Sequence, residues 1–225
     1  MFKQGLQQIF FRMIDRFASD TDGSTDGLKV TSDGLGSFVR SELLNIDVLE
    51  SKYNFVGDKY IVCPRRVSEK ISREFFKNFP EMDVRFTKIL GKFNLDIAYQ
   101  YITVYSGTEH RQSLLWHHDS VGHRLKVFIP LYSTSQNNSL FWEKNTFQEY
   151  KRPVYREERK TYKPFGEILG HGSNQNEILI LNTNSMHAGN PKISNGEIRN
   201  VFVLEFSNRL KSYVFGSRVG VREEV

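Results

Sequence analysis

The stretch LLWHHDSVGHRLKVFIPL, residues 114–131, decides the fold that we expect for this chain. It consists of an apolar strand, a polar His-His-Asp group and then a second apolar strand. Successive side chains of a strand point to opposite faces, so His117 and Asp119 lie on one face if the segment is extended. The stretch therefore predicts a β-rich protein that places an imidazole and a carboxylate together where a strand ends.

A second histidine, His187, follows another apolar strand (EILILNTNSMH), and Arg199 opens a third (IRNVFVLEFSN). In a double-stranded β-helix such strands lie side by side around one mouth, so His117, Asp119 and His187 can share a metal although 70 residues separate the histidines. Two imidazoles and one carboxylate leave three adjacent positions open on an octahedral ion, as in non-haem iron(II) oxygenases. Arg199 adds a planar positive fork for a carboxylate. Together they predict an iron site with a docking point for a keto acid.

The register of the His-Asp pair can be chosen from the chemistry of its second member. If His118 were the ligand, its partner two residues on would be Ser120, a poor iron ligand, whereas His117 is followed by Asp119, a hard oxygen donor. The competing interpretation has core histidines, a turn-capping Asp119 and an ordinary salt bridge at Arg199. The other histidines lie in Gly- and Ser-rich contexts, where we expect surface loops: His110, His123 and His171.

Composition favours a packed globular protein in a reducing compartment. The 225 residues suit a single domain, 39% are hydrophobic, and 18 Phe, 10 Tyr and 2 Trp can fill a core. Cys63 is the only cysteine, so we expect a cytoplasmic protein without disulfides. No apolar stretch has the length of a membrane span. The net charge of +5, from 31 basic and 26 acidic residues, is a mild excess that would suit an anionic partner.

We expect residues 1–90 to form a helical and loop lead-in, with a loop at 19–37, packed on a β-helix core at 91–210. Ser68 opens a helical segment that Pro80 ends. Residues 143–164 interrupt the strands with interleaved aromatic and basic residues, and both a lid over the site and a solvated excursion remain open. The predicted core strands are Ile97–Tyr105, Leu125–Leu131, Glu177–Leu181 and Ile198–Phe206.

The segments WHHD, LKVFIPL, TNSMHAGNP and EIRNVFVLEF resemble the phytanoyl-CoA dioxygenase-like branch of the iron(II)/2-oxoglutarate oxygenases, over about residues 88–208. The resemblance implies a mainly β protein with flanking helices (α+β) and a double-stranded β-helix (jelly-roll, cupin-like) core. It implies that His117, Asp119 and His187 bind iron and that Arg199 binds the distal carboxylate of 2-oxoglutarate. It also places three residues on pocket-lining strands: Gln100, Ile102 and Ile129. Lys126 is either a further carboxylate partner or, as we expect, an outward-facing lysine.

The function that this resemblance implies is an Fe(II)- and 2-oxoglutarate-dependent dioxygenase. It would hydroxylate a C–H bond of a small or lipid- or sugar-like, anionic substrate with O₂, release succinate and CO₂, and respond to ascorbate as an activator. Family members often carry a Gly-Pro-rich segment ending in Ser-His after the second strand. Here that stretch is SQNNSLFWEKNTFQEYK, so a fatty acyl-CoA substrate does not carry over.

Three alternatives use the same barrel. A cupin-like binding or sensor module would keep the metal without redox turnover, but it has no need of a keto-acid clamp such as Arg199. A nucleic-acid demethylase would place a second Arg six residues after the first, where this chain has Glu205, so we do not expect a nucleic-acid partner. An isomerase or lyase would need metal but no 2-oxoglutarate.

Overall fold

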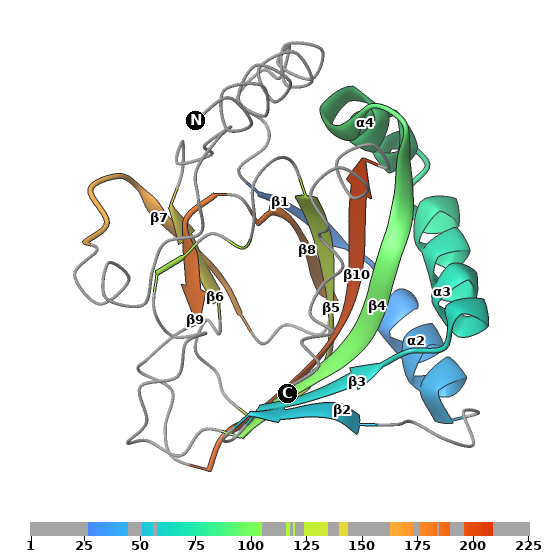
Figure 1. The fold of residues 1–225 in the computed structure, drawn as a ribbon, viewed down its shortest axis with the longest axis horizontal. Coiled ribbons are helices and arrows are strands. Elements are labelled where there is room, and N and C mark those ends of the chain that lie inside the picture. The colour runs from blue at the N-terminus through green and yellow to red at the C-terminus, as the bar shows by residue number, and fades with distance from the viewer. Residues whose placement is uncertain are drawn as a thin grey trace, which may run out of the picture.

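Two antiparallel sheets face each other, and helices cover the outer face of the larger one in the computed structural model (Figure 1). The structure describes residues 27–44, 51–55, 58–104, 116–117, 119, 124–134, 140–143, 163–172, 176–183, 185–189 and 196–208. The first 26 residues of the predicted lead-in, residues 114 and 115 of the apolar strand before His117, and nearly all of the 143–164 insertion lie outside these residues. None of the helices in the described part of the chain is long and apolar enough to span a membrane.

The larger sheet has seven strands in the order β1-β8-β5-β10-β4-β3-β2. Their bounds are β1 Leu28–Thr31, β2 Ser51–Phe55, β3 Asp58–Val62, β4 Phe93–Val104, β5 Arg124–Ser133, β8 Glu177–Asn182 and β10 Ile198–Asn208. The smaller sheet has the order β7-β6-β9, with β6 Leu140–Glu143, β7 Ile168–His171 and β9 His187–Gly189. This arrangement confirms the predicted mainly β fold with a jelly-roll core and flanking helices.

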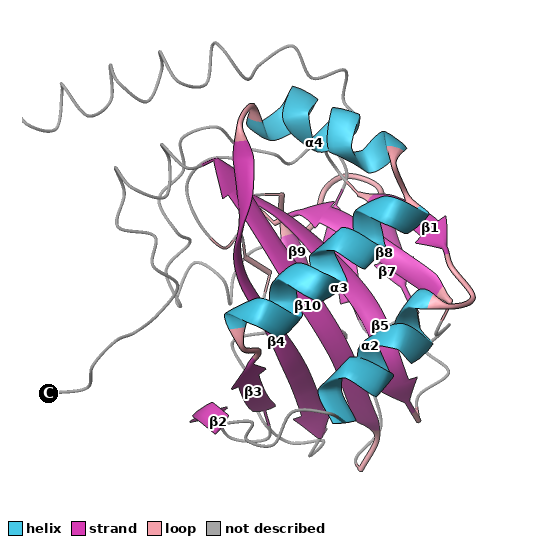
Figure 2. Ribbon diagram, turned by 90° about the vertical axis from the view of Figure 1, so that its right-hand side faces the viewer, coloured by secondary structure: helices cyan, strands magenta, loops and turns pink. Residues whose placement is uncertain are grey.

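Three helices lie across one face of the larger sheet (Figure 2): α2 Leu35–Leu44, α3 Arg65–Asn78 and α4 Glu81–Leu90. The helix predicted from Ser68 is α3, which begins three residues earlier, directly after Pro64, and ends before Pro80. Its apolar face buries Ile71 and Phe75 against the sheet. Aromatic rings pack between the helices and the sheet. The ring centroids of Phe86 on α4 and Phe206 on β10 are 5.3 Å apart.

Strand alternation divides the core into two layers. On β5, Val127 and Ile129 face the helices, whereas Phe128 faces the smaller sheet. On β10, Phe202 and Leu204 belong to the helix-side layer. Because central strands are buried on both faces, they read as continuous apolar runs and not as an alternation.

The described part of the lead-in contains strands that we did not expect. The loop prediction for 19–37 is wrong from Leu28 onward, because β1 pairs with β8 in the register Leu28↔Ile180 and α2 begins at Leu35. The strands β2 and β3 also come from residues before 90. A four-residue edge strand between turn residues carries too little periodicity to be recognised, because its stability comes from a partner about 150 residues away in sequence. The division into a lead-in and a core at residue 90 remains a prediction.

Candidate metal centre

Backbone pairing brings the two histidines together. His117 and His187 form an isolated antiparallel bridge, in which each N–H donates to the other's carbonyl at 2.9 Å. The Asp119 N–H donates to the Thr183 carbonyl, also at 2.9 Å. These backbone hydrogen bonds to Thr183 and His187 hold the segment that carries His117 and Asp119 against the chain between β8 and β9. They bring the side chains of His117, Asp119 and His187 together.

The ligand atoms of His117, Asp119 and His187 all lie within 4.8 Å of one another. Asp119 Oδ1 is 3.5 Å from Nε2 of each histidine. Atoms that share one ion at ~2.1 Å, with angles between ~90° and ~109°, lie about 3.0–3.4 Å apart, so little movement would close the site. The Nδ1 atom of His187 is 2.9 Å from the Ser185 carbonyl, which leaves the Nε2 lone pair free for a metal. These three predicted residues can hold one ion.

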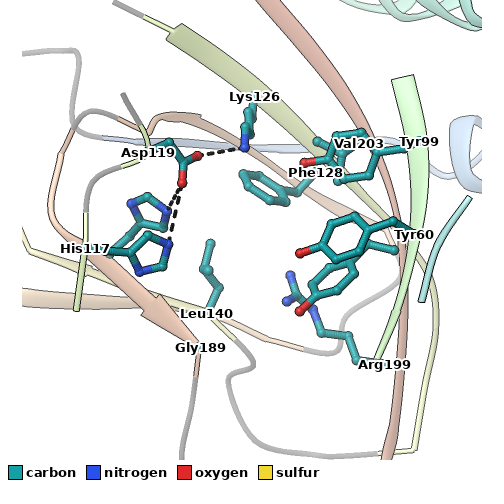
Figure 3. A pocket seen from close by; sticks show the side chains of 12 residues that line it. Tyr60, Tyr99, His117, Asp119, Lys126, Phe128, Leu140, Gly189, Arg199 and Val203 are labelled. Carbon is teal, nitrogen blue, oxygen red and sulfur yellow. Dashed lines mark hydrogen bonds and ion pairs between the residues drawn. The ribbon is translucent and has the colours of Figure 1, made fainter. Parts of the chain in front are cut away.

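Arg199 lies on β10 at the opposite side of the same cavity, and its guanidinium points into it (Figure 3). It is 7% exposed, and no described carboxylate lies within ion-pair distance of it. Among the described residues, its Nη2 has no hydrogen-bond partner. Its guanidinium lies 5.9 Å from the centre of the Tyr101 ring. A buried arginine without a counter-ion indicates a place for an anion, because burying an unpaired charge is costly.

Thr103 is a second polar residue beside Arg199 that the sequence analysis missed. The two are direct partners across β4 and β10, so their side chains lie on one face of the sheet. Thr103 is 2% exposed, and its Oγ1 has no hydrogen-bond partner in the described part of the chain. The pairing of Thr103 with Arg199 is what identifies it, and this pairing can be recognised only once the register of β4 and β10 is known.

Aromatic and apolar side chains line the cavity between the metal-ligand group and Arg199. Tyr60 stacks on Tyr101 with ring centroids 4.5 Å apart and lies 5.6 Å from Tyr99. Burial raises the pKa of Tyr99 to about 12, so its hydroxyl keeps its proton at neutral pH. Both sheets supply the other apolar walls, which are Phe128, Leu140 and Val203.

A charged cluster lies directly behind Asp119. The Lys126 ammonium is 2.7 Å from Asp119 Oδ2 and 3.4 Å from Glu205 Oε2, and Glu205 also pairs with Arg124. Burial alone would raise the pKa of Asp119, but the nearby Lys126 ammonium and the contacts with His187 and His117 lower it well below its usual value. Burial opposes the charge of Lys126, yet Asp119, Tyr99 and Glu205 raise its pKa well above its usual value. Both groups are therefore ionised.

The outward-facing position expected for Lys126 is wrong. Alternation along β5 turns Lys126 into the cavity, where its side chain is 13% exposed. The strands that carry Gln100, Ile102 and Ile129, which are β4 and β5, do line the cavity, but through the neighbouring side chains of Tyr99, Tyr101 and Phe128. Gln100 instead donates to Asn200 at 3.0 Å, and Ile129 lies in the helix-side layer. Ile102 also lies on the face of β4 that turns away from the cavity.

The prediction of a surface loop for His171 is also wrong. His171 ends β7 and is 1% exposed, with Nε2 at 2.8 Å from the Glu177 carbonyl. Burial lowers its pKa to about 4, so the ring is neutral at physiological pH. It is not part of the metal-ligand group. The other histidines, His110, His118 and His123, lie outside the described residues.

Solved structures share this fold. HygX from Streptomyces hygroscopicus, solved with nickel, 2-oxoglutarate and hygromycin B bound, gives a TM-score of 0.56 at 14% identity over 83% of this chain and 84% of that one. The epimerase SnoN, in complex with Fe³⁺, α-ketoglutarate and nogalamycin RO, gives 0.56 at 12% identity over 88% and 84%. AviO1 from Streptomyces viridochromogenes Tue57 gives 0.54 at 13% identity over 87% and 93%.

No family model matches this chain, and no curated protein matches it in sequence. The structural likeness, at these low identities, shows a shared fold. The chain thus has the fold of enzymes that have been crystallised with iron or nickel and with 2-oxoglutarate. The resemblance to the phytanoyl-CoA dioxygenase-like branch remains a prediction.

Proposed function

We propose that this protein is an iron(II)- and 2-oxoglutarate-dependent oxygenase that hydroxylates a C–H bond of a small molecule. The observation that carries the proposal is Arg199, a buried cation that has no counter-ion among the described residues, set across one cavity from the group His117, Asp119 and His187. A metal-binding module without keto-acid chemistry would have no use for such an arginine. Enzymes crystallised with 2-oxoglutarate on the same fold support this choice.

The residues of the cavity fit both groups. Two neutral imidazoles and one carboxylate suit Fe(II) and leave three positions for other ligands. A dicarboxylic keto acid needs a cation at its far end, and Arg199 with the Thr103 hydroxyl can donate to that carboxylate. When bound, iron and 2-oxoglutarate supply the activation of O₂, with release of succinate and CO₂.

The protein's own side chains orient and enclose these groups. The Ser185 carbonyl fixes the tautomer and ring plane of His187, and Lys126 fixes Asp119. The aromatic rings of Tyr60, Tyr99 and Tyr101 give the cavity an apolar wall beside Arg199, which strengthens the attraction between its charge and an anion. Because Tyr99 stays protonated, it adds no negative charge that would repel a carboxylate.

Epimerisation is a second candidate outcome, because SnoN, an epimerase solved with iron and α-ketoglutarate, has this fold. The two outcomes differ in the mass of the product, since hydroxylation adds one oxygen and epimerisation leaves the mass unchanged. We propose a small-molecule substrate, since HygX and SnoN were solved with hygromycin B and nogalamycin RO. The mild positive charge of the chain favours an anionic one.

The test is succinate formation by purified protein with Fe(II), 2-oxoglutarate, ascorbate and a panel of small molecules. We expect slow uncoupled turnover without substrate, its loss in His187→Ala, and one mole of metal per chain in the parent. As a control, His171→Gln removes a buried histidine outside the group and should keep the metal. Metal binding without any 2-oxoglutarate binding would favour a cupin-like binding module, and no metal binding would overturn the proposal altogether.

A further inference from the structure

Lys126 lies between two carboxylates at the side of the metal-ligand group. Its ammonium donates to Asp119 Oδ2 at 2.7 Å and forms an ion pair with Glu205, whose Oε2 is 3.4 Å away. These two contacts hold the ammonium beside Asp119 and commit its charge to carboxylates of the protein. Lys126 therefore differs from Arg199, whose Nη2 has no partner among the described residues.

Strand pairing holds the ammonium in this position. Lys126 and Glu205 are direct partners across β5 and β10, and Arg124, two residues before Lys126, shares its face and pairs with Glu205. The charges alternate along the series Asp119, Lys126, Glu205 and Arg124, and they sum to zero. Moving Lys126 would leave two carboxylates short of a partner, so its place is fixed by more than its contact with Asp119.

The consequence is that the two oxygens of Asp119 are not equivalent. Oδ1 faces Nε2 of both histidines at 3.5 Å, while Oδ2 is occupied by the ammonium. We propose that Lys126 is a positioning residue that restricts Asp119 to a single metal–oxygen bond and so keeps three positions of the ion open. This inference rests on the metal site proposed above and adds a residue that controls how that site is filled.

Lys126 acts on the ion in two ways that substitutions can separate. Its positive charge repels a dication, which lowers metal affinity, and its N–H bond holds Oδ2 away from the ion. Lys126→Met removes both effects, so Asp119 can chelate the ion through two oxygens. Lys126→Gln removes the charge but keeps an N–H donor, and Lys126→Arg keeps both. A merely structural lysine predicts the opposite result for methionine, namely a displaced Asp119 and weaker metal binding.

The first measurement is the affinity for Ni²⁺ by titration calorimetry. We expect Lys126→Met to bind at least about tenfold tighter than the parent, Lys126→Gln also tighter, and Lys126→Arg within about threefold of it, because only the first two remove a nearby cation. Lys29→Met is the matched control, since it removes another sheet lysine from an ion pair, with Glu177 at 3.1 Å, and should leave the affinity unchanged. Unchanged or weaker binding by Lys126→Met overturns the inference.

The second measurement is nitric oxide binding to the protein loaded with Fe(II) and 2-oxoglutarate, followed by electron paramagnetic resonance. With two oxygens of Asp119 on the ion no position remains, so Lys126→Met should take up nitric oxide at least about fivefold less well, while Lys126→Gln and Lys126→Arg should resemble the parent. Equal uptake by all four proteins contradicts the single-bond restriction. If Lys126→Met does not fold, tighter Ni²⁺ binding by Lys126→Gln than by Lys126→Arg decides. If the parent itself binds no metal, the proposed function fails instead.

Discussion

Replacing Arg199 by methionine should stabilise the ligand-free protein while it weakens 2-oxoglutarate binding. Methionine has a similar reach and no polar hydrogen, so it removes a buried donor that has no partner in the described residues. Such a donor costs about 1–3 kcal/mol, and the lost contact with Tyr101 is worth about 0.5–1 kcal/mol. We expect a net gain of about 1 kcal/mol in the free energy of unfolding, which raises the Tm of a chain of this size by about 2–4 °C.

The effect on 2-oxoglutarate follows from the hydrogen bonds that the guanidinium would make. Each charge-assisted bond is worth about 1.5–3 kcal/mol, so loss of at least ~2 kcal/mol lowers the affinity about 30-fold. At 2-oxoglutarate 100 times the Kd of the parent, the parent gains about 2.7 kcal/mol of stability, whereas the variant gains about 0.9 kcal/mol. Thermal melts of Ni²⁺-loaded protein with and without 2-oxoglutarate measure both effects.

Arg124→Met is the matched control, because it makes the same change at a buried arginine that has a carboxylate partner, Glu205. Breaking a buried pair costs about 3–5 kcal/mol, so this variant should melt well below the parent. If Arg199→Met is destabilised like Arg124→Met, or if it keeps the full 2-oxoglutarate shift, Arg199 has a structural role and the reasoning is refuted.

Three further outcomes are expected. Thr103→Val should raise ligand-free stability and lower 2-oxoglutarate affinity by about 1 kcal/mol each, in the melts described above, because it deletes a buried hydroxyl that has no partner among the described residues. The pKa of His171, about 4 in the fold against 6.5 otherwise, gives stability that is present above pH 6.5 and lost as the pH falls toward 4. Between pH 7.5 and 5, protonation of His171 should lower the free energy of unfolding by ~2 kcal/mol. Urea unfolding of His171→Gln should not show this loss. Finally, His187→Ala should bind Ni²⁺ at least about 100-fold more weakly while its far-ultraviolet circular dichroism stays the same, because it removes one of three ligands.

The parts of the fold that the sequence predicts are those with strong local signals. The apolar runs that became β4, β5, β8 and β10 are long, and α3 has a clear helical period with a proline at each end. The metal-ligand group was predictable because His117 and Asp119 stand two apart and His187 follows a strand that reaches the same mouth. In each case residues close in sequence carry the information.

The face of each central strand could not be predicted, for a physical reason. On β5 and β10 helices bury one side and the second sheet encloses the other, so the central stretches 127–131 and 201–204 are continuously apolar and show no period of two. A shift of one residue then exchanges cavity and core. The sequence could therefore place Gln100, Ile102 and Ile129 on strands that line the cavity, but it could not show that the neighbouring side chains form the wall. The pairing of β1 and the burial of His171 could not be predicted either, because both depend on strand partners outside the local sequence, β8 for β1 and β6 for His171.

The charged residues of β5 and β10 indicate which face of each strand lines the cavity, although the apolar residues do not. Lys126 lies between Leu125 and Val127, and Glu205 between Leu204 and Phe206, so each is a charge inside a buried strand and must find a partner. Around the cavity, three buried or nearly buried cations, Arg124, Lys126 and Arg199, stand against two anions, Asp119 and Glu205. A further buried carboxylate, that of Glu143, accepts from the backbone N–H groups of Phe165 and Gly166. Four of the five charges around the cavity pair among themselves, so within the described residues the uncompensated charge falls on Arg199, at the far side of the cavity from the metal ligands. A ligand with one carboxylate for that arginine and a second for a metal ion satisfies both ends, which is why a dicarboxylic keto acid fits this cavity better than a neutral or singly charged cosubstrate.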